Sequence, residues 1–167
     1  MKIHIIGCSG SGKTYLAKAL SKKYNIPSFD LDDVYWDNCA SAYNSKMAIE
    51  KRTELLDGIL QNDDWIVEGV YYAWVGQCFE DADTIYVLDM PKRIYIYRII
   101  KRAIKRKLGF EKGKRETWKS VCNLVKWTNT FQSENMVQIR KILTQHKEKT
   151  IWLKRPNEVR KVIREGI

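Results

Sequence analysis

Residues 7–14, GCSGSGKT, combine the residue types that can wrap a chain of phosphates. Glycines at 7, 10 and 12 let the backbone bend around an anion, so that successive N–H groups point at it. Lys13 can reach the β and γ phosphates, and the Thr14 hydroxyl can ligate Mg²⁺. We therefore expect ATP with Mg²⁺ to bind this loop, with Lys13 also stabilising the phosphoryl group during its transfer. The expected nucleotide-binding residues are Gly7, Cys8, Ser9, Gly10, Ser11, Gly12, Lys13 and Thr14.

Carboxylates and aromatic side chains follow the next two apolar runs of the chain. Asp32 is placed to orient or deprotonate an acceptor hydroxyl, and Glu68 to hold Mg²⁺ through a water, although the two assignments can be exchanged. Trp36, Gly69 and Tyr71 are expected to bind the acceptor, and Tyr72 and Trp74 follow the same run. Each residue also has a structural explanation, because Asp32 or Asp33 could cap a helix and Gly69 could serve only a turn.

Basic residues are concentrated after Pro91. Residues 92–119 hold 12 Lys and Arg against 2 Asp and Glu, whereas residues 1–91 hold 8 against 14. Arg98 and Arg102, one helical turn apart, are expected to act catalytically on the phosphates, with a mobile lid at about 108–117 closing over them. A solvated basic face is the alternative, with Ile96, Ile100, Ala103 and Ile104 forming the apolar side of the same helix. A surface for DNA or RNA is a further alternative.

Apolar runs and helical periodicity alternate along the whole chain. This order predicts a single α/β domain over residues 1–167, with a central parallel sheet of about five strands and ligands at the carboxyl ends of the strands. Arg155 and Pro156, directly after the last strand, are therefore also expected to contact the nucleotide. The predicted strands are 3–6, 28–31, 65–68, 84–89 and 150–153. The predicted helices are 14–24, 46–62, 92–107, 118–131, 134–147 and 157–165.

Composition and cysteine usage restrict the class of protein. A chain of 167 residues that is 44% hydrophobic can bury one full core. Its four cysteines, at 8, 39, 78 and 122, form no CxxC pair, which argues against structural zinc and for a reducing compartment. Since no run approaches ~18 uninterrupted apolar residues, we expect no membrane span and a cytoplasmic location.

Several segments resemble one known family. Beside the loop at 7–14, they are LDDVYW at 31–36, WIVEGVYY at 65–72, ADTIYVLDMP at 82–91 and TIWLKRPNEV at 150–159. Together they resemble the adenylate-kinase-like P-loop proteins of the DNA topology modulation (FlaR-related) family over nearly the whole chain. That family often has Asp-Gly-Asn-Tyr where this chain has Glu68-Gly69-Val70-Tyr71, so a longer carboxylate replaces a short one and an amide is lost.

The resemblance implies kinase-type machinery, because relatives in the broader group transfer the γ-phosphoryl group of ATP to nucleotides or small hydroxyl compounds. We therefore expect a three-layer P-loop NTPase fold of the nucleoside-monophosphate-kinase type with a short basic lid. The expected function is that of a kinase acting on a nucleotide, nucleoside or other small hydroxyl acceptor. The alternative is a nucleic-acid-binding ATPase that uses residues 92–119, and some non-specific binding of nucleic acid is expected in either case.

Overall fold

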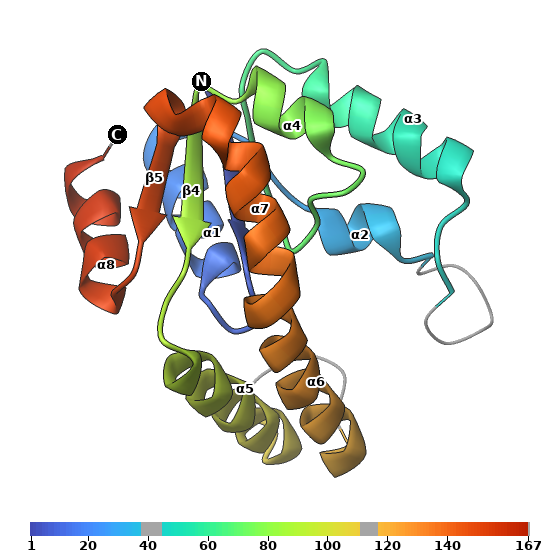
Figure 1. Ribbon diagram of the computed structural model, residues 1–167, viewed down its shortest axis with the longest axis vertical. Coiled ribbons are helices and arrows are strands. Elements are labelled where there is room, and N and C mark those ends of the chain that lie inside the picture. Colours follow the sequence, from blue (N-terminus) through green and yellow to red (C-terminus); the bar gives the residue numbers. More distant parts are fainter. Residues whose placement is uncertain (38–44, 111–116, 167) are drawn as a thin grey trace.

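Five parallel strands form one sheet with helices on both faces (Figure 1). The structure is a computed structural model that describes residues 1–37, 45–110 and 117–166. The strands are β1 (Lys2–Gly7), β2 (Ser28–Asp30), β3 (Trp65–Gly69), β4 (Thr84–Leu88) and β5 (Thr150–Leu153). They lie in the order β2-β3-β1-β4-β5. The predicted α/β fold with a central parallel sheet of about five strands is confirmed.

The central strand β1 sets the position of the phosphate loop. Its apolar run is fully buried because helices cover both faces, as is typical of a parallel sheet. It pairs with β3 on one side, where Ile5 is opposite Glu68 and Ile6 opposite Gly69. On the other side Gly7 is opposite Leu88 of β4. The loop after Gly7 therefore begins beside the last residues of both neighbouring strands.

Helices cover both faces of the sheet. In Figure 1, α4 and α7 lie in front of the sheet, and α1 lies behind it and contacts α8. The helices are α1 (Lys13–Tyr24), α2 (Leu31–Tyr35), α3 (Ile49–Leu60), α4 (Gly76–Asp81), α5 (Lys92–Lys107), α6 (Trp118–Thr130), α7 (Met136–Leu143) and α8 (Pro156–Glu165). None of the helices among the described residues is long and apolar enough to cross a bilayer.

Two short helices, α2 and α4, were not expected from the sequence. Each has fewer than two turns, 5 and 6 residues respectively, so neither shows a complete apolar period. Helix α2 nevertheless has an N-terminal cap, because the carboxylate of Asp30 accepts a hydrogen bond from the Asp32 amide at 2.9 Å. The predicted cap at Asp32 or Asp33 is therefore wrong: the cap is Asp30, and Asp32 and Asp33 lie in the first turn.

The two helices expected at 118–131 and 134–147 form one continuous rod. A π-helical segment, η1 (Phe131–Asn135), joins α6 to α7, and a 3₁₀ segment, η2 (Thr144–Lys149), follows α7. The polar residues at 132–135 do not interrupt the helix, since they include neither glycine nor proline. The wider turn keeps Phe131 and Met136, five residues apart, both buried in the core.

Helix α5 has a different buried face from the one predicted. Its buried residues are Tyr95, Ile99 and Ala103, spaced four apart, and Ile99 and Ala103 pack against Val121 of α6. The predicted apolar side is wrong at Ile100 and Ile104, which are 36% and 44% exposed. Most of the predicted lid, residues 111–116, lies outside the described residues.

Candidate active site

The phosphate loop connects β1 to α1 in a conformation that requires its glycines. Gly10 and Gly12 have φ values of 76° and 103°, in the left-handed region that favours glycine. A Cβ on Gly12 would lie 3.1 Å from Nη1 of Arg98, and one on Gly7 would lie 2.8 Å from the carbonyl oxygen of Leu88. The loop is therefore enclosed by β4 on one side and by α5 on the other.

A cleft of about 1030 Å³ opens above this loop, at the carboxyl ends of the strands. This is the position at which parallel α/β sheets bind ligands. From the loop, Ser9, Gly10, Gly12, Lys13 and Thr14 line the cleft. Gly7, Cys8 and Ser11 are instead buried beneath it. The remaining lining residues are Asp30, Asp32, Tyr35, Trp36, Lys46, Glu68, Gly69, Val70, Tyr71, Arg98, Arg102, Arg106, Leu124 and Trp127.

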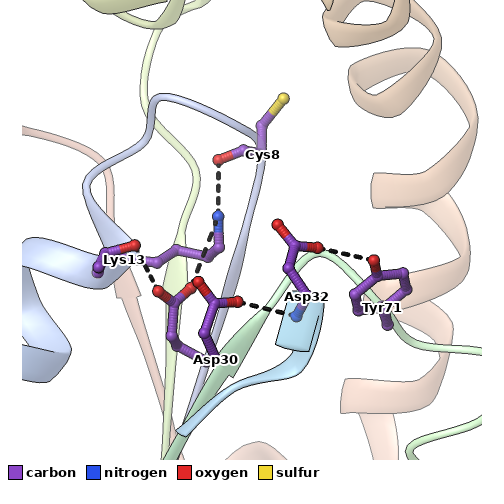
Figure 2. Close-up of polar contacts among 7 residues, drawn as sticks. Cys8, Lys13, Asp30, Asp32 and Tyr71 are labelled. Carbon is purple, nitrogen blue, oxygen red and sulfur yellow. Dashed lines mark hydrogen bonds and ion pairs between the residues drawn. The ribbon is translucent and has the colours of Figure 1, made fainter. Parts of the chain in front are cut away.

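Lys13 is held in a fixed position at the base of the cleft. Its ammonium group donates a hydrogen bond to the main-chain carbonyl of Cys8 at 3.2 Å and lies 4.0 Å from Oε2 of Glu68 (Figure 2). Both Lys13 and Glu68 are buried, so little solvent screens their charges. The cation is therefore fixed within the loop, as a phosphate-binding lysine requires.

A group of oxygen atoms suited to Mg²⁺ lies beside Lys13. The Thr14 hydroxyl donates a hydrogen bond to Oε1 of Glu68, and Asp30 is opposite Glu68 in the β2–β3 pairing. Burial, with the nearby charge of Glu68 adding to it, raises the pKa of Asp30 to about 7. Two adjacent carboxylates that disfavour each other's charge fit a divalent cation held partly by protein and partly by phosphate and water. Among the described residues, no group of three or more His, Cys, Asp or Glu side chains could hold a metal ion without such partners.

Asp30 was not selected from the sequence. The available signal was its position as the last residue of an edge strand, aligned with Glu68 at the end of the neighbouring strand. Such an alignment requires the strand order, which the sequence alone did not provide.

Asp32 lies in the same cleft and is oriented from two sides. Its main-chain amide is bound by Asp30, and its carboxylate oxygen Oδ1 accepts a hydrogen bond from the Tyr71 hydroxyl at 2.7 Å (Figure 2). Burial and the hydrogen bond to Asp32 raise the pKa of Tyr71 well above its usual range, so the hydroxyl stays protonated and continues to donate. Among the residues that the structure describes, none donates a hydrogen bond to the other carboxylate oxygen, which is therefore available to a reacting hydroxyl.

The predicted acceptor residues Trp36, Gly69 and Tyr71 all line the cleft. A β-bridge between Trp36 and Lys46 places Lys46 there as well. Tyr35 also lines the cleft, stacked on Tyr71 with ring centroids 4.7 Å apart. Tyr35 and Lys46 were not among the residues selected from the sequence.

Two aromatic residues expected near the acceptor lie elsewhere. Tyr72 and Trp74 do not line the cleft. Trp74 instead packs behind Tyr35 and Tyr71, and the guanidinium of Arg52 lies 4.5 Å from its ring centroid. Trp74 therefore contacts two rings that line the cleft without lining it itself.

Three arginines of α5 line the cleft at successive turns. Arg98 donates hydrogen bonds to the main-chain carbonyls of Ser11 and Gly10, the latter at 3.4 Å. Arg102 and Arg106 follow on the same face. Arg106 was missed, although its four-residue spacing from Arg102 was the signal for it. Lys101 and Lys105 of the same helix are exposed and do not line the cleft.

A second hollow of about 330 Å³ adjoins the loop at Ser11 and Gly12. Pro156 lines this hollow, together with Arg98 and Arg160, whereas Arg155 lines neither the hollow nor the cleft. The structure thus places Pro156 beside the loop and Arg155 away from it. Arg160 could not be separated by sequence from the other basic residues of its helix.

Comparison with known proteins identifies the family. A family model described as AAA domain matches residues 3–119. The chain belongs to this AAA domain family. The protein named Uncharacterized protein YqaC from Bacillus subtilis (strain 168) is 26% identical to this AAA domain protein over 145 residues, 86% of the present chain and 80% of its own length. A shikimate kinase from Chlamydia pneumoniae is 46% identical over 52 residues, 30% of each chain.

Solved structures of small-molecule kinases share the fold of this AAA domain protein. A shikimate kinase from Acinetobacter baumannii in complex with shikimate aligns with a TM-score of 0.59 at 13% identity, over 98% of this chain and 89% of that one. The shikimate kinase from Aquifex aeolicus vf5 aligns with a TM-score of 0.52 at 17% identity, over 99% and 92%. A gluconokinase from Sinorhizobium meliloti 1021 aligns with a TM-score of 0.53 at 12% identity, over 98% and 87%. The fold is that of P-loop kinases, and the resemblance to the DNA topology modulation family stays a prediction.

Proposed function

We propose that this AAA domain protein is an ATP-dependent kinase that transfers the γ-phosphoryl group to a hydroxyl of a small acceptor. The observation that carries the proposal is that a phosphate loop and an oriented, cleft-facing carboxylate, Asp32, line the same cleft. A protein that only binds a nucleotide and transfers no phosphoryl group does not need the Asp32 carboxylate in the cleft. The shared fold with shikimate kinases and a gluconokinase supports the proposal, since those proteins act on small molecules.

On the donor side, the loop amides and Lys13 bind the triphosphate and balance its charge. Arg98 holds the loop by its carbonyls, and Arg102, one turn further along the cleft, is placed to meet charge on the transferring group. Pro156 and Arg160 line the hollow next to the loop and are the proposed contacts of the nucleoside part of ATP. Thr14, Glu68 and Asp30 would hold Mg²⁺, which would neutralise charge on the phosphates.

On the acceptor side, Asp32 accepts a hydrogen bond from the acceptor hydroxyl and takes its proton during transfer. The hydroxyl oxygen bonds to the γ phosphorus as the bond from that phosphorus to the bridging oxygen of ADP breaks. Tyr71 keeps the carboxylate turned toward the acceptor, and Trp36 and Gly69 line the space that the acceptor occupies.

The test is transfer of labelled γ-phosphate from ATP to a panel of nucleosides, nucleotides and sugar acids. We expect one class of acceptor to be phosphorylated in the presence of Mg²⁺, and Lys13→Ala to abolish transfer with the circular dichroism spectrum unchanged. The matched control is Lys18→Ala, because Lys18 is an exposed lysine of the same helix and does not line the cleft. Wild-type turnover in the Lys13 variant would contradict the proposal.

The alternative, a nucleic-acid-binding ATPase, depends on where the basic residues of 92–119 point. Three of the arginines in this segment, at 98, 102 and 106, line the cleft. The outward face of α5 carries Lys101 and Lys105 but also the exposed apolar side chains of Tyr97 and Ile104. Clear stimulation of ATP turnover by DNA, without transfer to any small acceptor, would favour the ATPase over the kinase.

A further inference from the structure

Six of the residues that line the cleft carry aromatic or aliphatic side chains. Tyr35, Trp36, Val70 and Tyr71 line it from the segments that follow β2 and β3. Leu124 and Trp127 of α6 line it from a separate element. Trp36 and Trp127 are only half-buried, so part of each indole stays accessible. Aromatic side chains with accessible surface in a cleft offer a flat ring the contacts that it prefers.

Few neutral hydrogen-bonding side chains line the cleft. Among the described residues that line it, there is no asparagine, glutamine or histidine. The hydroxyl of Tyr71 already donates to Asp32, and Ser9 and Thr14 belong to the phosphate loop. This leaves the Tyr35 hydroxyl and the indole N–H groups of Trp36 and Trp127. An acceptor with many hydroxyl groups loses affinity in such a site, because every hydroxyl that leaves water needs a new partner.

The aromatic rings of Tyr35, Trp36 and Tyr71 pack against one another. Tyr35 is stacked on Tyr71, and Trp36 meets Tyr35 edge to face at a centroid distance of 4.8 Å. The guanidinium of Arg52 lies 5.5 Å from the centroid of Tyr35, and the ammonium of Lys46 lies 5.7 Å from it. Rings that already contact one another have less side-chain freedom to lose when a ligand binds, which favours binding.

We propose that the acceptor is a compound with a planar aromatic ring. Its reacting hydroxyl is attached outside that ring and reaches Asp32. This inference rests on the proposed kinase function and assigns its substrate class. The ring contacts Trp36 and its neighbours, while the hydroxyl is directed toward the free oxygen of the Asp32 carboxylate. Compounds that carry several hydroxyls but have no aromatic ring are poor acceptors.

Calorimetric binding in the presence of Mg·ADP tests the proposal without depending on turnover. The ring-bearing probes are adenosine, cytidine and pyridoxine, and the ring-lacking probes are shikimate and gluconate. We expect at least one ring-bearing probe to bind at least about tenfold more tightly than either ring-lacking probe, as stacking on one aromatic side chain allows. Equal or tighter binding of shikimate or gluconate, or no binding of any ring-bearing probe at millimolar concentration, would overturn it.

Variants of Trp36 test whether the ring-bearing probe binds against this side chain. Trp36→Leu should weaken the bound ring-bearing probe about tenfold, and Trp36→Phe should restore most of the affinity. Trp118→Leu is the matched control, because Trp118 is 58% exposed and does not line the cleft. Unchanged affinity in Trp36→Leu would contradict the proposed position of the ring.

The affinity for Mg·ATP, measured separately, distinguishes this inference from the proposed function. Loss of probe binding in Trp36→Leu with unchanged Mg·ATP affinity supports the acceptor assignment. A wild-type protein that binds no Mg·ATP would instead remove the kinase proposal itself. Tight Mg·ATP binding together with a preference for gluconate or shikimate would leave the kinase standing and overturn only the aromatic acceptor.

Discussion

Arg98 reaches from α5 to the phosphate loop, where its guanidinium donates a hydrogen bond to the main-chain carbonyl of Ser11. Its partial burial lowers its pKa, although a guanidinium remains charged at any ordinary pH. The Gly10 and Ser11 carbonyls of the loop are thereby tied to α5. We therefore expect helix α5 to influence nucleotide binding through the shape of the loop as well as through charge.

Arg98→Gln should raise the Kd for Mg·ATP about tenfold, because the loop loses a charged hydrogen bond that fixes its shape. Arg102→Gln is the control, since Arg102 lies in the same cleft and is expected to lower kcat with little change in ATP affinity. Binding can be followed by the displacement of a fluorescent ATP analogue. Equal effects of the two variants on Kd would show that Arg98 acts as a phosphate ligand and not through the loop.

Asp32→Asn should lower kcat at least about 100-fold, because the amide cannot take the proton of the acceptor. Tyr71→Phe, which removes only the orienting hydroxyl, should lower kcat about tenfold or less. Neither change should alter the Kd for ATP, since neither residue belongs to the phosphate loop. Steady-state kinetics with the acceptor found by screening gives both quantities. A larger loss in Tyr71→Phe than in Asp32→Asn would reverse the two roles.

Gly69→Ala should destabilise the protein by about 1–3 kcal/mol through overpacking. A Cβ at this position would lie 2.8 Å from Cδ1 and 2.9 Å from Cβ of Leu31, at the beginning of the helix that carries Asp32. Gly58→Ala is the control, because a Cβ there has no neighbour within 4 Å and alanine favours the α3 helix. Urea denaturation should show a loss of stability for the first variant and none for the second.

The contribution of His4 to stability should fall as pH decreases from about 6.5 to about 4, whereas Asp30, whose pKa is raised to about 7, contributes in the opposite direction over this range. Burial lowers the pKa of His4 to about 4 from its usual 6.5. Between these values the unfolded chain binds more protons at His4 than the folded protein does, so the contribution of His4 becomes weaker as pH decreases. The shift corresponds to about 3 kcal/mol at most.

A variant that cannot titrate isolates the contribution of His4. Between pH 7 and pH 4, His4→Leu should lose less free energy of unfolding than the wild type. The control is His146→Gln, because His146 is also buried but lies 3.6 Å from Glu80, and this change should leave most of the dependence in place. An unaltered pH dependence in His4→Leu would show that other groups cause it.

The sequence predicted best those elements whose pattern is contained in one short segment of the chain. The buried runs of β1, β3 and β4 and the phosphate loop are visible as uninterrupted patterns, and each was expected within one or two residues of its observed bounds. The faces of α5 were predicted less well, because a basic helix with isoleucines at neighbouring positions has more than one possible apolar side. Packing against α6 selects Ile99 and Ala103, and this contact is long-range.

Within the candidate site, residues that act directly were easier to predict than residues that act through others. Lys13, Asp32 and Glu68 follow from motif or strand-end position. Asp30, Tyr35 and Arg106 depend on which strands are neighbours and on which way a helix is turned. A strand-end position is also not sufficient. Asp89 follows a strand, but it forms an ion pair with Arg140 and does not line the cleft.

The central position of β1 also determines when the site can assemble. This strand precedes both of its partners in the chain, and its pairings join Ile3 to Ile66 and to Thr84. Closing such long loops costs chain entropy before any pairing compensates for it, which slows folding. The phosphate loop, although made early by the ribosome, therefore becomes ordered only after β4 has left the exit tunnel. Nucleotide capture by a nascent chain should begin late in synthesis, and chains truncated before β4 should not retain ATP.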